Sequence, residues 1–165
     1  MATTTHRDAQ RSRVYAGEGA WEARLDAARR GARRATVAGS QVLLPQEVLF
    51  GSLQAAQDYA DLQLRHLGVP GVTVRARRGH RRAHWSLEGG LATVALPVPV
   101  HGTSWALREA VLLHELAHHV AFHLDAASDH GPLFVRRMLQ LVASALGPEA
   151  ALALQVDYAE SGVTG

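Results

Sequence analysis

The stretch AVLLHELAHHV, residues 110–120, decides how the rest of the chain is interpreted. It contains the motif H-E-x-x-H, formed by His114, Glu115 and His118. On an α-helix, residues four apart differ by about 40° around the axis and about 6 Å along it, so two imidazoles can converge on one metal ion. Glu115 follows His114 by about 100°, which lets its carboxylate reach a metal-bound water without being a ligand. The spacing therefore predicts a zinc site on a helix.

A hydrolytic zinc site takes three protein ligands and leaves one position for water, so a third ligand is needed. The extended motif H-E-x-x-H-x-x-G-x-x-H is excluded, because Ala121 and Leu124 occupy its glycine and third histidine positions. His119 and His123 lie about 100° and about 140° from His118 around the helix, which favours roles on the polar face or behind the ligands. The third ligand must come from another part of the chain.

His130 is the third ligand that the sequence favours. It lies in a loop long enough to turn the chain back after His118, and the Gly131-Pro132 pair would start a helix directly behind it. Glu149 is the other candidate, but its neighbourhood GPEAALAL fits a first-turn acid that stabilises a helix N-terminus.

Two further roles stay open at this level. A hydrogen-bond partner for a ligand histidine is usual in metal sites, and Asp125 or Asp129 would serve either as such a partner or as a capping residue. The donor that stabilises an oxyanion has four candidates, His101, His119, His123 and Tyr158.

The composition restricts the class of protein. The chain has 165 residues, a mass of 17.7 kDa and 47% hydrophobic residues, which suits one domain with a real core. It has no cysteine, which excludes disulfides, thiolate zinc sites and Fe–S clusters. Apolar runs such as residues 91–100 are too short and too rich in proline to span a bilayer, and the first twenty residues lack an apolar signal core. We expect a cytoplasmic protein without a membrane partner.

The hydrophobic pattern predicts an α+β fold, with a small, twisted, mostly antiparallel sheet packed against the motif helix and its flanking helices. A single domain is expected over residues 13–165, behind a flexible segment over residues 1–12. Ser52 and Gly68 are the expected caps of one helix. Periodicity and turn residues predict further helices over residues 18–34, 103–124 and 132–146 and a last short one to residue 158. Residues 36–44 are expected to form a short strand or a hairpin with its turn at Gly39-Ser40. Strands are expected over residues 72–76, 84–87 and 91–96, with residues 84–87 returning beside 72–76.

A second feature is a basic cluster between two predicted strands, made of Arg75, Arg77, Arg78, Arg81 and Arg82. A hairpin that carries these side chains could contact phosphates, and Trp85 could stack on a base. Arginines on an exposed strand face, with one tryptophan in the core, explain the same residues.

The segments HELAHH (residues 114–119) and DHGPLF (residues 129–134) resemble the SprT-like zinc metallopeptidases and related minimal zincins, whose motif is H-E-x-x-H with a downstream His-Gly-Pro. The chain is also similar to a small family of uncharacterised bacterial and phage metallohydrolases. That similarity covers most of the domain, through RDAQRSRVY (7–15), FGSLQAAQDY (50–59), VTVRARRGHRRAHW (72–85), WALREAVLLHELAHH (105–119) and HGPLF (130–134).

The resemblance implies a minimal zincin-like fold with Zn²⁺ as cofactor, His114, His118 and His130 as its ligands, and Glu115 as catalytic acid and base. In zincins a strand before the motif helix often forms the sheet edge where an extended peptide pairs, and residues 91–96 are placed for this role; an ordinary core strand explains the same residues. The chain departs from SprT-like members at Leu133, where they often carry an acid, and it has no cysteine-rich zinc ribbon. The DNA-linked protease activity of some SprT relatives is therefore not expected.

The sequence thus predicts a zinc-dependent hydrolase, most simply a metallopeptidase with a peptide or protein substrate. The alternative is a nucleic-acid-associated module in which zinc is chiefly structural and the arginine hairpin, residues 75–82, is the contact surface. Glu115 separates the two predictions, because a structural zinc site has no use for a carboxylate beside its ligands.

Overall fold

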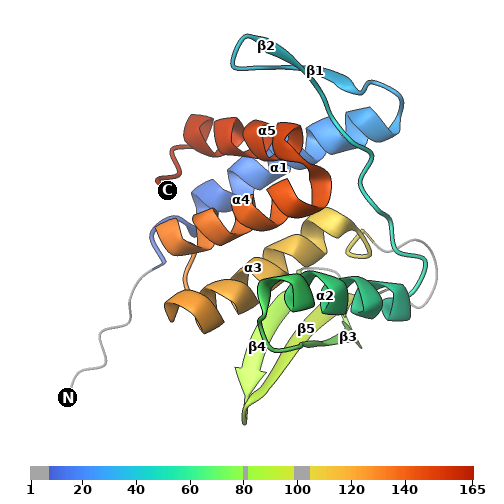
Figure 1. Ribbon diagram of the computed structural model, residues 1–165, viewed down its shortest axis with the longest axis vertical. Helices are drawn as coiled ribbons and strands as arrows, with labels where there is room; N and C mark the ends of the chain where they lie inside the picture. Colours follow the sequence, from blue (N-terminus) through green and yellow to red (C-terminus); the bar gives the residue numbers. More distant parts are fainter. Residues whose placement is uncertain (1–7, 80–81, 99–104) are drawn as a thin grey trace.

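The computed structural model describes residues 8–79, 82–98 and 105–165 and has an α+β fold. In chain order its elements are α1 (Arg11–Arg29), β1 (Arg34–Val37), β2 (Ser40–Leu43), α2 (Leu53–Leu67), β3 (Thr73–Arg77), β4 (His84–Glu88), β5 (Leu91–Pro97), α3 (Glu109–Asp125), α4 (Pro132–Leu146) and α5 (Pro148–Glu160). The motif helix α3 is the centre of the arrangement (Figure 1). Helices α1, α4 and α5 lie on one side of it, and α2 lies with the three-stranded sheet on the other.

The core is continuous around α3, whose residues are buried along almost its whole length. Helix α1 joins this core through Trp21, which is fully buried and donates a hydrogen bond from its indole to the Ala150 carbonyl of α5 (3.0 Å). On the same two helices, Arg24 forms a bidentate ion pair with the buried Asp157. These contacts fix α1 against the C-terminal helix, and α1 contributes residues to the site described below.

Helix α2 confirms the prediction from its caps. The Ser52 hydroxyl accepts a hydrogen bond from the Ala55 backbone N–H, and Gly68 ends the helix in the left-handed conformation (φ 64°). Helix α1 differs from the prediction, because it begins at Arg11 and ends at Arg29 instead of covering residues 18–34. Two glycines in its first half, Gly17 and Gly19, weaken the helical signal there.

The predicted strand order is wrong. Strand β5 lies in the middle of the three-stranded sheet, parallel to β3 and antiparallel to β4, so the sheet is mixed and β3 and β4 do not form a hairpin. The buried side chains explain the order: Val94, Ala95 and Leu96 of β5 suit a central strand, whereas β3 and β4 carry charged residues that suit edges. Among the described strands, the edge on the α3 side is therefore β4, and not residues 91–96.

Three further predictions concern the N-terminal segment, the start of the motif helix and membrane-spanning segments. The flexible segment predicted over residues 1–12 falls partly outside the described residues, at 1–7, whereas Asp8 and Gln10 contact other parts of the domain. The start predicted for the motif helix, at residues 103–104, also lies outside them. In the part of the chain that the structure describes, no helix is both long enough and apolar enough to cross a bilayer.

Candidate metal centre

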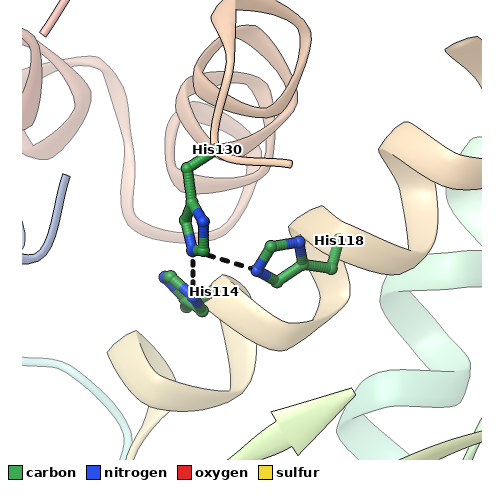
Figure 2. Close-up of side chains that lie close together, drawn as sticks. All are labelled: His114, His118 and His130. Atoms are coloured by element: carbon green, nitrogen blue, oxygen red, sulfur yellow. Dashed lines mark hydrogen bonds between the residues drawn. The ribbon is translucent and has the colours of Figure 1, made fainter. Parts of the chain in front are cut away.

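Three histidines meet where α3 faces the start of α4. His114 and His118 lie one turn apart on α3, and His130 lies in the short connection to α4. Ala126 ends α3 in the left-handed conformation (φ 53°), which turns the chain back toward the helix. The Asp129 carboxylate then accepts a hydrogen bond from the Gly131 backbone N–H (3.1 Å), just before Pro132 starts α4. This local chemistry places the His130 ring opposite the two rings of α3 (Figure 2).

The two ring-nitrogen distances from His130 match those of a tetrahedral metal site. The Nε2 atom of His130 lies 3.2 Å from Nε2 of His118 and 3.4 Å from Nε2 of His114 (Figure 2). Ligand atoms of all three residues lie within 4.8 Å of one another. Zinc–imidazole bonds of about 2.0–2.1 Å at tetrahedral angles separate two ligand nitrogens by roughly 3.3 Å. The three histidines can therefore hold one metal ion, and they are the residues that the sequence predicted.

Two carboxylates hold the outer nitrogens of these rings. Nδ1 of His114 lies 2.7 Å from the Glu18 carboxylate, whose other oxygen accepts a hydrogen bond from the Tyr158 hydroxyl (2.7 Å). Nδ1 of His130 lies 2.5 Å from the Asp8 carboxylate. A carboxylate at Nδ1 keeps the proton on that nitrogen, so the Nε2 lone pair faces the centre. The arrangement is that of metal ligands held by a second layer of hydrogen bonds.

Aromatic side chains close the back of the site. The fully buried Phe134 of α4 contacts all three histidine rings, with ring centroids 4.5–5.0 Å apart. Tyr15 of α1 stacks on His114 and contacts His130, each with ring centroids 5.3 Å apart. This surround fixes the ring orientations and limits the access of water from α1 and α4.

Burial and neighbouring charges set opposite pKa shifts in the two rings of α3. Burial lowers the pKa of His114, but the charge and hydrogen bond of Glu18 outweigh burial and raise this pKa to about 9. Burial, together with the charges of His114 and His130, lowers the pKa of His118 to about 2. His118 is therefore neutral at pH 7, which is the form that binds a metal, whereas His114 must lose a proton first.

Glu115 lies beside the three rings and is 6% exposed. Burial raises the pKa of its carboxyl group, against the charge of His114 and the backbone N–H of Trp85, which lower it. Glu115 lines a cavity of about 390 Å³ together with His118 and His130, and a second cavity of about 300 Å³ together with His114. The carboxylate thus adjoins the open side of the site.

The hydrogen-bond partners of the histidines are not the residues that were predicted for this role. Asp125 pairs with two arginines of α4, and Asp129 caps the Gly131 N–H. The carboxylates that contact the outer nitrogens of His114 and His130 are Glu18 and Asp8, which were not predicted from the sequence. No local pattern could have shown them, because they lie about a hundred residues before the rings that they contact. Glu149 is exposed in the first turn of α5, as a helix-stabilising acid.

Each of the three candidate oxyanion donors that the structure describes contacts a residue other than the three-histidine group. His119 is fully buried behind it, where one ring nitrogen meets the Pro70 carbonyl (2.7 Å) and the other the Trp85 indole N–H (3.1 Å). The Tyr158 hydroxyl donates to Glu18, His123 packs against His119, and His101 lies outside the described residues. His119 therefore positions Trp85.

The basic cluster is divided by the sheet order. Arg77 and Arg82 line the larger cavity beside the metal centre, whereas Arg75 and Arg78 are exposed outside it. Arg81 lies outside the described residues. The arginines that the sequence grouped into a hairpin therefore fall into two groups, one of which belongs to the site.

Comparisons of the chain with protein-family models, with curated proteins and with solved structures gave no match. The function is therefore inferred from the geometry of the site.

Proposed function

We propose that this protein is a zinc-dependent hydrolase of the minimal zincin type, a metallopeptidase, with His114, His118 and His130 as zinc ligands. The observation that carries the proposal is the group of three histidines, with Nε2 of His130 3.2 and 3.4 Å from Nε2 of His118 and His114, and with Glu115 lining the cavity beside them. Three neutral imidazoles suit zinc among the divalent metals, and three protein ligands are the usual number in a hydrolytic site.

Zinc bound there would supply a Lewis acid that activates a water molecule and polarises the carbonyl group of the substrate. The Glu115 carboxylate accepts a proton from that water as its oxygen adds to the carbonyl carbon. When the carbon–nitrogen bond breaks, Glu115 gives the proton to the departing amine. Burial and the raised pKa of Glu115 suit a group that must both take and return a proton near neutral pH.

A peptide substrate is supported by the strand next to the site. Strand β4 is an edge of the described sheet, and its residues His84 and Trp85 line the larger cavity with Glu115. An extended peptide can add to such an edge through main-chain hydrogen bonds. The two cavities adjoin each other, because Tyr15, Arg82 and Glu115 line both of them, and together they offer room for several residues of a peptide.

The alternative, a nucleic-acid-associated module with a structural zinc, has less support. Structural zinc sites have four protein ligands and are closed. Among the described residues this group has three donors and adjoins two cavities. Of the arginines of that alternative, Arg77 and Arg82 line the cavity beside the three histidines, and Arg75 and Arg78 are not among its lining residues.

The test of the proposed function separates metal binding from turnover. Zinc-loaded native protein and the Glu115→Gln variant are incubated with a peptide mixture, and cleavage is followed by mass spectrometry. Glu115→Gln should retain one zinc per chain and lose at least about a hundredfold in rate, since general acid–base catalysis contributes roughly 10²–10⁴-fold. His114→Ala should lose the zinc, whereas His123→Ala, at a helix histidine outside the group, should keep both zinc and activity. Cleavage by Glu115→Gln at the native rate would contradict the assignment.

A further inference from the structure

The larger cavity beside the metal centre carries an excess of positive charge. Three arginines, Arg11, Arg77 and Arg82, line it against two carboxylates, Asp8 and Glu115. The arginines come from α1, β3 and the residues just before β4, so three separate parts of the chain bring charge to one place. Arginines that only make a surface soluble are distributed over that surface, so they are not expected to converge on one cavity.

Two of the guanidinium groups are held by one ring. The guanidinium carbon of Arg82 lies 4.6 Å from the Tyr15 ring centroid, and that of Arg11 lies 5.7 Å from it. The Tyr15 centroid in turn lies 5.3 Å from the ring centroids of His114 and His130. The charge of Arg82 is therefore within about 10 Å of both ligand rings, a distance that about three residues of extended peptide span.

The charges of Arg77 and Arg82 are not neutralised by an ion pair within the described residues. Among the described residues, no carboxylate forms an ion pair with Arg77 or Arg82, whereas Arg24, Arg108 and Arg137 each pair with at least one acid. Asp8 lies near Arg11, but its carboxylate is held by His130. The donors of Arg77 and Arg82 are therefore available to a bound anion, for which a guanidinium is the best-matched side chain.

We propose that this cavity binds a carboxylate of the substrate, from an acidic side chain or the free C-terminus of a peptide, within about three residues of the bond that is hydrolysed. The proposal rests on the proposed function and names its substrate class. A peptide is favoured over a nucleic acid because the charges lie around a cavity next to the β4 edge, where an extended chain can pair, and because Arg75 and Arg78 are not among the residues that line it.

The test measures binding and not turnover, so it does not depend on the role of Glu115. The zinc-loaded full chain with Glu115→Gln is titrated into fluorescein-labelled decapeptide pools, and binding is read by fluorescence anisotropy. The pools are randomised over uncharged residues except at four central positions, which are Glu in the acidic pool and Gln in the neutral pool. Each pool is made with a free and with an amidated C-terminus, which separates the two sources of the carboxylate.

If the carboxylate is that of a side chain, the acidic pool should bind about five- to tenfold more tightly than the neutral pool. If it is the C-terminus, the pools with a free C-terminus should bind more tightly than the amidated pools by the same factor. This factor is expected for exposed or half-exposed ion pairs made by two arginines. When Arg77→Gln and Arg82→Gln are both added to the Glu115→Gln chain, this preference should disappear. Arg75→Gln is the matched control, because it removes the same charge from the same strand outside the cavity and should leave the preference unchanged. Equal zinc content in all variants shows that the metal centre is intact.

Three results would overturn the proposal: equal affinity for all pools, a preference that survives the double variant, and no measurable binding of any pool. A fourth is tighter binding of a single-stranded 12-nucleotide DNA that is lost in the double variant, which would assign the cavity to nucleic acid. Failure of the proposed function is seen separately, as cleavage of peptides by the Glu115→Gln chain or as failure to bind zinc.

Discussion

Replacing Glu18 with glutamine tests whether the site is built to hold a metal. Glu18 is 5% exposed and accepts two hydrogen bonds, one from Nδ1–H of His114 and one from the Tyr158 hydroxyl, each 2.7 Å long. Glutamine has one acceptor oxygen and one amide NH₂ group, so it can satisfy only one of these donors. If the NH₂ group faces His114, the ring must place its proton on Nε2, and Nε2 can then no longer bind a metal.

The expected loss in zinc affinity is 10- to 100-fold, the usual effect of removing such a partner, which corresponds to about 1.4–2.7 kcal/mol. The pH of the assay matters, because Glu18 also raises the pKa of His114 to about 9. At pH 7 the native ring must lose a proton before it binds zinc, at a cost of about 2.7 kcal/mol for two pH units. Glu18→Gln removes part of that cost, so the two effects oppose each other near neutral pH. The comparison is therefore made at pH 9.5.

Zinc affinity is measured by competition with a chelating dye, starting from zinc-free protein. Tyr158→Phe is the matched control, because it removes the second hydrogen bond and leaves the carboxylate on His114. It should change zinc affinity less than about threefold while lowering the free energy of unfolding by about 1 kcal/mol. Native zinc affinity in Glu18→Gln at pH 9.5, or an equal loss in both variants, would refute the role of Glu18.

Further predictions concern packing and pH. Gly17→Ala should lower the free energy of unfolding by about 1–3 kcal/mol in urea titrations, because its Cβ would lie 2.7 Å from Cδ1 of Tyr158. Gly19→Ala should raise the free energy of unfolding by about 0.5–1 kcal/mol, because its Cβ would have open space around it. Zinc affinity of the native protein should rise with pH from 7 and level off near 9, as His114 loses its proton; a flat profile would exclude the raised pKa. In zinc-free protein the same shift should stabilise the fold fully below about pH 6.5, and this contribution should disappear as the pH rises through about 9.

The parts of the site that were predicted from the sequence depend on local geometry. The helix repeat fixes the directions of His114, Glu115 and His118 once the segment is helical, and the segment is an almost wholly buried helix. His130 could be predicted because Gly131-Pro132 marks a helix start directly after it. Each of these inferences needs only a few neighbouring residues.

The parts that were missed depend on contacts between distant segments. Asp8 and Glu18 reach the site only because α1 packs against the C-terminal helix, which no periodicity in α1 shows. The order of the sheet was wrong for the same reason: short strands with similar sequences can pair in several ways, and the burial of β5 decides among them. The cavity that holds Arg77 and Arg82 follows from that order.

The measurement that tests the central claim most directly is X-ray absorption at the zinc edge of the protein loaded with one zinc per chain. Three imidazole nitrogens of His114, His118 and His130 at about 2.0–2.1 Å, with one further light-atom ligand, are the predicted coordination. The His130→Ala variant should show two imidazoles or fail to retain the metal. A native spectrum with fewer than three imidazoles, or one left unchanged by His130→Ala, would contradict the account.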